Sequence, residues 1–270
     1  MLLLPKRHMK IAHEDGVIAP KTPNAYSVIK MTVEWGLSLI LLVLAAPILA
    51  IVAVLVKISS PGPVFYNQLR LGQDGREYRV YKIRTMLNEC EVAGAVWAVQ
   101  DDPRVTPIGR FLRETHLDEI PQLWNVLRGE MSLIGPRPER PEIATQLESV
   151  MPTYRERLLV RPGITGLAQL RLPADSDVSG VRRKLSHDLY YIRERGFILD
   201  LQIVLSTLPY LLARFSKSLS ELLIRSHGKR ADRQRNLGGQ TEVVETLELR
   251  LPVIEASRAM NEAMDGAQAA

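Results

Sequence analysis

The stretch WGLSLILLVLAAPILAIVAVLV, residues 35–56, is the most informative part of this chain. Its 22 residues carry no charge. A helix of that length, at ~1.5 Å per residue, covers roughly the 30 Å hydrocarbon core of a bilayer. The stretch begins too far into the chain and runs too long for the apolar region of a signal peptide. It therefore predicts a protein bound to a membrane.

Pro47 interrupts this apolar stretch. It removes one amide donor and clashes with the carbonyl of Val43, so we expect the helix to bend there. The 12 residues before the proline and the 9 after it each reach about half of the bilayer. Basic residues, which accumulate on the cytoplasmic side, flank both ends: Lys6, Arg7, Lys10, Lys21, Lys30, Lys57, Arg70, Arg76 and Arg79. We predict a re-entrant helical hairpin over residues 31–58, with a kinked spanning helix as the alternative.

A second apolar stretch runs from Ile198 to Leu212 and is too short to span a membrane. Its apolar residues recur at helical spacing. An excess of basic residues follows between Arg214 and Arg235. The pattern is compatible with a helix lying flat at the interface, with its basic tail on anionic headgroups. A core helix with a solvated tail explains it equally well.

The composition and the charge distribution exclude several classes of protein. The chain has 270 residues, 46% of them hydrophobic, and a net charge of +5. Its single cysteine, Cys90, excludes a disulfide framework and a cysteine-based zinc site. Residues 70–140 hold 11 basic and 11 acidic residues, so they form no nucleic-acid stripe. We divide the chain into an N-terminal cytoplasmic segment (1–30), the membrane helix (31–58), a cytoplasmic domain (59–215) and a tail that is basic and then acidic (216–270).

The local patterns of the cytoplasmic part predict an α+β fold that is mostly helical. Two β-rich runs, 64–71 and 76–84, flank a Gly-Gln-Asp-Gly loop and predict a β-hairpin. Short amphipathic helices are expected to begin at Pro107, Asp118, Pro141 and Val181. Arg161 to Gly166 predicts a turn-rich loop. The expected fold is thus a re-entrant membrane hairpin, a small β-hairpin and short interfacial helices around a site.

The sequence lacks the common enzyme motifs for phosphate loops, dinucleotides, nucleophilic serines and zinc. What remains is Asp118-Glu119, followed by Pro121, a pattern that alone is typical of a helix cap. Arg113 lies just upstream, and Arg137 stands between two prolines. Arginine matches phosphate oxygens in pairs, although either arginine could also form an ordinary surface ion pair. Carboxylates and arginines near a membrane suggest phosphoryl chemistry with Mg²⁺ bound through carboxylates and substrate phosphates.

Four motifs occur in order between Lys30 and Leu212: KIRTM at 82–86, LDEIPQLWNVLRGEMS at 117–132, GPRP at 135–138 and PGITG at 162–166. Together with Arg113 they resemble the bacterial sugar transferase family, the monotopic enzymes that transfer sugar 1-phosphates to polyprenyl phosphate. The family starts exopolysaccharide and O-antigen repeats, and the chain is similar to its small members, in particular those that start exopolysaccharides with galactose or glucose phosphate.

The resemblance implies that Asp118 is the nucleophile and Glu119 a ligand of Mg²⁺. Asp118 would take the sugar phosphate from a UDP-sugar, releasing UMP, and pass it to undecaprenyl phosphate. Residues expected to bind the substrates are Lys82, Arg84, Arg113, Gln122, Asn125, Arg137 and Pro138. The enzyme would lie in the bacterial inner membrane with its site on the cytoplasmic face. A homodimer is possible, and no nucleic-acid partner is expected.

Several positions depart from the family pattern. Ala46 and His116 stand where serine is usual, and Leu167 replaces a tryptophan; residues 170–173 also differ. Two other functions remain open. A metal-dependent glycosyltransferase using Asp101-Asp102 would release UDP, and a non-catalytic assembly factor for polysaccharide export would release no UMP.

Overall fold

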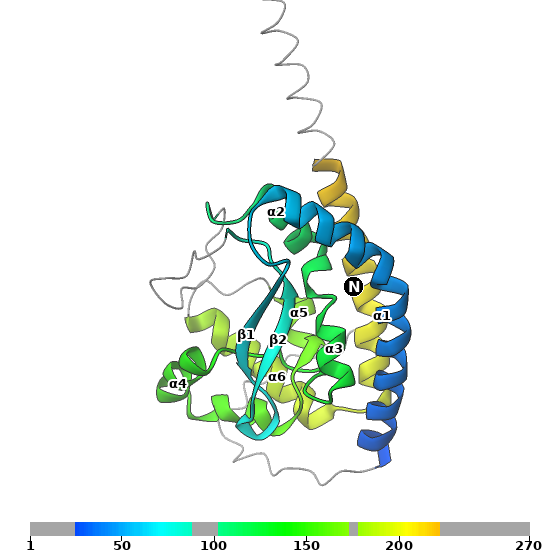
Figure 1. Cartoon of the computed structure of the whole chain (residues 1–270). Helices are drawn as coiled ribbons and strands as arrows, with labels where there is room; N and C mark the ends of the chain where they lie inside the picture. Colours follow the sequence, from blue (N-terminus) through cyan, green and yellow to red (C-terminus); the bar gives the residue numbers. More distant parts are fainter. Residues whose placement is uncertain (1–24, 88–101, 173–177, 222–270) are drawn as a thin grey trace, which may run out of the picture. The chain divides into compact units, whose positions relative to one another are not determined.

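The computed structural model describes residues 25–87, 102–172 and 178–221 (Figure 1). The chain divides into two units, Met1–Ser218 and Leu219–Ala270, and nearly all described residues belong to the first. Most of the predicted segment 1–30, Cys90, Asp101, and the tail after Glu221 lie outside the described residues. The helices are α1 Ala25–Ser59, α2 Pro107–Thr115, α3 Gln122–Leu127, α4 Pro141–Val150, α5 Leu167–Arg171, α6 Val178–Glu194 and Phe197–Glu221. The strands are β1 Phe65–Leu71, β2 Glu77–Ile83, β3 Ser132–Ile134 and β4 Gly163–Thr165. The prediction of a mostly helical α+β fold is confirmed.

Helix α1 contains the apolar stretch and passes through Pro47 as one helix. Its ribbon bends partway along, as a proline inside a helix requires (Figure 1). Most of its apolar side chains are exposed. Both α1 and the helix Phe197–Glu221 are long and apolar enough to cross a membrane. This pattern indicates membrane association, because a soluble domain rarely leaves so much apolar surface uncovered. The prediction that the second apolar stretch is too short to span was wrong, because its helix continues beyond Leu212 to Glu221.

Both arms of α1 pack on the folded part of the chain. Before the proline, the indole Nε1 of Trp35 donates to the carbonyl of Leu127 at the end of α3 (3.2 Å). After the proline, Val52 and Val56 are buried with Leu112 of α2 and with the end of β2. The two ends of the apolar helix therefore contact the same domain.

The predicted β-hairpin is confirmed. Strands β1 and β2 are antiparallel, with Phe65 opposite Ile83 and Leu71 opposite Glu77. A 3-10 turn, Gln73–Gly75, connects them, and Gly75 takes a positive φ of 77°. Val80 is almost completely buried, together with Val126 and Met131. The hairpin thus rests one face on α3.

A second, parallel pair of strands was not expected from the sequence. Ser132 of β3 pairs with Gly163 of β4, and Ile134 pairs with Thr165. A methyl group at Gly163 would lie 2.0 Å from the backbone nitrogen of Gly135, so the two chains approach as only glycine permits. This pairing places the loop after β3, residues 135–138, beside Pro162 and Gly163 at the start of β4.

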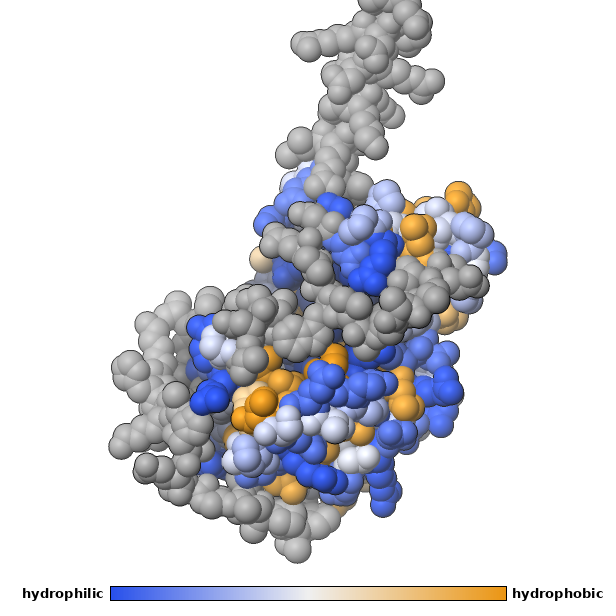
Figure 2. Space-filling model, turned by 90° about the vertical axis from the view of Figure 1, so that its left-hand side faces the viewer, coloured by the Kyte–Doolittle hydropathy of each residue, from blue (hydrophilic) through white to orange (hydrophobic). Residues whose placement is uncertain are grey.

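The main core lies among α4, a 3-10 segment Pro152–Leu159, α5, α6 and the start of the helix Phe197–Glu221. Leu167 and Ile203 are almost completely buried there. The face at the left of Figure 1 carries mainly hydrophilic side chains among its described residues, with apolar ones scattered (Figure 2). That face contrasts with the exposed apolar side chains of α1.

Candidate active site

The two carboxylates of Asp118 and Glu119 lie on a tight turn that follows α2 in the chain. Thr106 caps α2 by accepting a hydrogen bond from the amide of Gly109 (2.9 Å). The helix ends at Thr115, and the next residue, His116, has a left-handed φ of 58°, an uncommon conformation for a residue with a Cβ. The chain then forms a 3-10 turn, Leu117–Glu119. Asp118 and Glu119 are each only 7% exposed there.

The sequence predicted that Asp118 begins a helix, and that was wrong. Helix α3 begins only at Gln122, and the amide of Trp124 bonds back to the carbonyl of Pro121 (3.0 Å). The amides of Ile120 and Leu123 likewise bond three residues back, to the carbonyls of Leu117 (3.4 Å) and Ile120 (3.0 Å), so i→i+3 bonds lead the chain from His116 into α3. The carboxylates are therefore held by a turn, and α3 is a short helix behind them.

Two predicted residues, Lys82 and Arg137, meet at a third, Glu119. Lys82 of β2 places its Nζ 2.7 Å from Glu119 Oε1. Arg137, from the loop after β3, places Nη2 at 2.7 Å from the same oxygen and Nη1 at 3.4 Å from Oε2. Segments from three parts of the chain thus converge on one carboxylate.

The two neighbouring carboxyls have opposite pKa shifts. Burial, and then repulsion from Glu119, raise the pKa of Asp118 from 3.8 to about 6, against the pull of Lys82, Arg113 and Arg137. Burial also opposes the ionisation of Glu119, but Arg137 and Lys82 outweigh it and hold its pKa well below the ordinary value. Paired carboxyls whose pKa values are pushed apart are typical of acid, base and nucleophile assignments in active sites.

Arg113 belongs to the same cluster. Its charge lowers the pKa of Asp118, and its Nε donates to the hydroxyl of Thr85 (2.8 Å). Lys82 is buried enough that desolvation lowers its pKa, although Glu119 opposes the shift. Two carboxylates and three cations therefore form one partly buried ion cluster.

Two of the predicted substrate-binding residues bond to the protein backbone. Arg84, 6% exposed, donates through Nη2 to the carbonyl of Ser60 (2.8 Å) and through Nη1 to the next carbonyl, and so caps the end of α1. Asn125, fully buried, accepts from the amide of Tyr81 (3.1 Å) and donates to the carbonyl of Arg79 (2.8 Å). These contacts fix α1 and α3 around the site.

The other two predicted residues lie close to these elements. Gln122 is buried at the start of α3. The carbonyl of Pro138 accepts a hydrogen bond from Arg70 of β1 (3.2 Å). A role of either residue in substrate binding stays a prediction.

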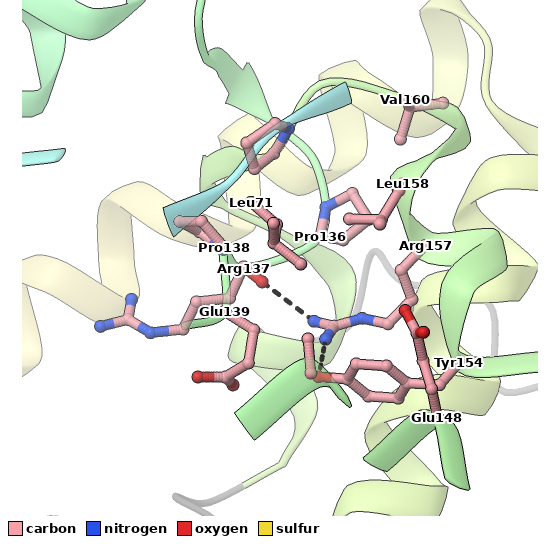
Figure 3. A pocket seen from close by; sticks show the side chains of 12 residues that line it. Leu71, Pro136, Arg137, Pro138, Glu139, Glu148, Tyr154, Arg157, Leu158 and Val160 are labelled. Atoms are coloured by element: carbon pink, nitrogen blue, oxygen red, sulfur yellow. Dashed lines mark hydrogen bonds between the residues drawn. The ribbon is translucent and has the colours of Figure 1, made fainter. Parts of the chain in front are cut away.

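The sequence reasoning missed three residues behind the Arg137 loop: Tyr154, Arg157 and Asp188. Arg157 donates to the backbone carbonyl of Arg137 (Figure 3). The Tyr-x-x-Arg spacing was a possible signal, because residues three apart lie on one face of a 3-10 segment.

The carboxylate oxygens of the site are suited to binding a magnesium ion. Among the described residues no group of three or more metal-binding side chains occurs. Mg²⁺ needs only one or two carboxylates when substrate phosphates supply further oxygens. Both short contacts of Glu119 fall on Oε1, whereas Oε2 has one long contact of 3.4 Å and keeps acceptor capacity.

Asp102, the nucleotide ligand expected for the alternative glycosyltransferase function, already pairs with Arg104. Asp102 is buried, and Arg104 donates to both of its carboxylate oxygens, with Nη2 at 2.6 Å from Oδ2. A metal or nucleotide at Asp102 would have to displace this paired contact.

The chain is similar to known enzymes over most of its length. It is 41% identical over 203 residues to a UDP-N-acetylgalactosamine-undecaprenyl-phosphate N-acetylgalactosaminephosphotransferase of Aeromonas hydrophila, covering 75% of this chain and 48% of that protein. It is 40% identical over 194 residues to an exopolysaccharide production protein of Rhizobium leguminosarum, covering 69% of this chain and 96% of that protein. A glucose-1-phosphate transferase of Escherichia coli, acting on UDP-glucose and undecaprenyl phosphate, is 40% identical over 74% of this chain and 45% of its own length.

The chain thus spans about half of the first and third of these relatives and nearly all of the second. The first and third are named as transferases of a sugar phosphate to undecaprenyl phosphate, and the second is named for exopolysaccharide production. The family model described as "Bacterial sugar transferase" matches residues 25–214, from the start of α1 to the helix Phe197–Glu221. This chain belongs to the bacterial sugar transferase family.

Proposed function

We propose that this protein transfers a hexose 1-phosphate from a UDP-sugar to undecaprenyl phosphate, as the first membrane step of exopolysaccharide or O-antigen-type assembly. One observation carries the proposal: Asp118 is buried with a raised pKa beside Glu119, whose charge Lys82 and Arg137 offset. Such a site offers one reactive carboxylate and cations for phosphate oxygens.

In the first step a carboxylate oxygen of Asp118 attacks the phosphorus that bears the sugar. The bond from that phosphorus to the bridging oxygen of the diphosphate breaks, and UMP leaves with the bond electrons. The product is an aspartyl phosphosugar. Asp118 suits this role better than Glu119, because two cations already engage the Glu119 carboxylate and reduce its nucleophilicity.

In the second step a phosphate oxygen of the lipid attacks the phosphorus of this intermediate. The acyl phosphate bond breaks, Asp118 is regenerated as a carboxylate, and polyprenyl diphosphate sugar forms. Splitting the exchange in two avoids holding the anionic donor and the anionic lipid phosphate together against their mutual repulsion. One phosphoanhydride is made as another is broken, so no additional energy source is required.

The cations have distinct places in this scheme. Lys82 and Arg137 lie on the Glu119 side of the pair, and Arg113 acts on Asp118 from α2. Their donors would bind the equatorial oxygens of the phosphoryl group in each transition state. Glu119, through Oε2, would hold Mg²⁺ together with substrate phosphate, and the ion would supply further charge neutralisation.

The membrane geometry of α1 supports the proposed location. Lys30, at one end of α1, pairs with Asp200 (2.6 Å), while Ser60, just past the other end, accepts a hydrogen bond from Arg84. A helix crossing the whole bilayer would separate its ends by the full hydrocarbon thickness of about 30 Å. Because both ends bond to one folded domain, we propose a re-entrant helix in the cytoplasmic leaflet of the inner membrane, with the site at headgroup height. The helix Phe197–Glu221 would lie along the interface.

The test of this function is the leaving nucleotide and the covalent intermediate. Full-length protein is incubated with a panel of UDP-sugars and undecaprenyl phosphate, and UMP and UDP are separated. We expect UMP, and labelled sugar phosphate on the polypeptide when lipid is omitted. Asp118→Asn should abolish the label, whereas Asp74→Asn, on the exposed hairpin turn, should retain it. Release of UDP would indicate glycosyl transfer, and full activity of Asp118→Asn would refute the scheme.

A further inference from the structure

Arg137 is fixed at both its head and its backbone. Its guanidinium engages Glu119, while its carbonyl accepts a hydrogen bond from Arg157 Nη2 (3.0 Å; Figure 3). The side chain is 46% exposed, so packing alone does not immobilise it. Pro136 and Pro138 have no amide, and their carbonyls accept hydrogen bonds from the amide of Gly163 (2.8 Å) and from Arg70 (3.2 Å). The hydrogen bond from Arg157 is the contact that holds the carbonyl of Arg137 itself, between these two bonded prolines.

Arg157 is itself held on its other sides. Its Nε donates to Oδ2 of Asp188 on α6 (2.8 Å), and Nη1 donates to the hydroxyl of Tyr154. The guanidinium carbon lies 4.9 Å from the centre of the Tyr154 ring. The side chains of Arg157 and Asp188 are 11% and 4% exposed. A planar fork bonded in three directions has little rotational freedom left, so it can define the position of a backbone atom.

The contacts form a continuous series from the core to the carboxylate pair. Asp188 orients Arg157, Arg157 holds the carbonyl of Arg137, and the Arg137 guanidinium engages Glu119. A displacement of about 1 Å in a group that binds a reacting phosphate can cost two orders of magnitude in rate. The outer members of the series are therefore placed to affect the reaction without touching substrate.

We propose that Arg157, held by Asp188, is a positioning residue for phosphosugar transfer that acts through Arg137. This inference rests on the proposed function, because it assigns to Arg137 a contact with the transferred phosphate. The competing explanation is that the Arg157–Asp188 pair only stabilises the fold, in which case its loss would lower activity by the same factor whether or not Arg137 is present.

A double-mutant cycle separates the two explanations. Arg157→Lys keeps a cation beside Asp188, but a single ammonium cannot reproduce the fork that reaches Asp188, Tyr154 and the Arg137 carbonyl together. Initial rates of UMP release are measured for wild type, Arg157→Lys, Arg137→Ala and the double variant, with radiolabelled donor for the slow enzymes. We expect Arg157→Lys to lower kcat about tenfold in wild type, and less than about twofold when Arg137 is absent.

Asp188→Asn is the second variant, in case Arg157→Lys does not fold, and it should show the same dependence on Arg137 with a smaller loss. Arg104→Lys is the matched control, because Arg104 also forks onto a buried aspartate but lies outside the Arg137 loop. It should lose stability without a kcat effect that depends on Arg137. Equal losses in both backgrounds, with an active wild type, would overturn the role of Arg157 alone. A wild type that releases no UMP would overturn the proposed function and this role with it.

Discussion

Lowering the pH should slow the first half-reaction because its nucleophile takes up a proton. Burial, followed by repulsion from Glu119, raises the pKa of Asp118 from 3.8 to about 6. Only the carboxylate attacks phosphorus, so the rate depends on the ionised fraction, which falls as the pH decreases through the pKa. The acid limb of the pH profile is therefore expected near pH 6, about two pH units above that of an ordinary aspartate.

The size of the effect follows from the ionised fraction. With a pKa of about 6, roughly nine-tenths of Asp118 is ionised at pH 7 and roughly one-tenth at pH 5. The rate of enzyme labelling should therefore fall about tenfold between these values. An aspartate with the ordinary pKa of 3.8 would stay almost fully ionised over the same range, and the rate would hardly change.

The assay must exclude the lipid acceptor, because a phosphate monoester has its own ionisation near pH 6. Rapid mixing of the full-length protein with radiolabelled UDP-sugar, followed by quenching, measures attachment of label in a single turnover. Returning an aliquot from pH 5 to pH 7 tests that the loss is reversible. A profile that is flat from pH 7 to pH 5 would refute the assignment of the titrating nucleophile to Asp118.

A substitution provides an independent check on the cause of this shift. Lys82 lowers the pKa of Asp118 by its charge. Lys82→Met should therefore move the midpoint of the acid limb upward, whatever it does to the maximal rate. A midpoint that moves toward lower pH would contradict the electrostatic account.

Four further predictions concern stability and packing. Asp118→Asn should raise the free energy of unfolding by about 3 kcal/mol at pH 8, where the raised pKa penalises the folded state, and by little near pH 4; denaturant titration at both values checks the sign. Asn125→Leu should cost about 2–4 kcal/mol by leaving backbone groups of β2 unpaired, with an unchanged KM for UDP-sugar. Gly163→Ala should lower kcat about a hundredfold, because its methyl group would overlap the Gly135 loop, whereas Gly36→Ala, with open space around it, should be silent. Lys30→Met should lower stability by about 1–3 kcal/mol, because Glu34 and Asp200 lose their cation but keep hydroxyl donors, and an unchanged melting curve would contradict this.

The sequence was most informative where local rules determine structure. The uncharged run with its internal proline gave α1, and the Gly-Gln-Asp-Gly loop between β-rich runs gave the hairpin of β1 and β2. The Pro at the start of α2 and of α4 marked both helices correctly. Each of these signals depends on residues adjacent in the chain.

The missed features depend on contacts between distant segments. Strands β3 and β4 have three residues each, too few for a periodic pattern, and they form because Gly135 and Gly163 permit close approach. The turn at Asp118 was mistaken for a helix start because a capping pattern precedes both structures. The bonds of Arg84 and Asn125 to backbone atoms could not be inferred either, since sequence does not reveal which polar groups need a buried partner.

The charges of the ion cluster give a reason to expect a divalent cation. Lys82, Arg113 and Arg137 exceed Asp118 and Glu119 by one positive charge when both carboxyls are ionised. The diphosphate of a UDP-sugar adds two negative charges, so donor binding would leave the cluster net negative just as a carboxylate must approach phosphorus. A divalent cation bound to Glu119 and to the UDP-sugar would make the net charge of the cluster positive again. Removing divalent cations by chelation should therefore suppress labelling of the enzyme, and added Mg²⁺ should restore it, whereas labelling that persists in the chelator would show that the three basic side chains suffice.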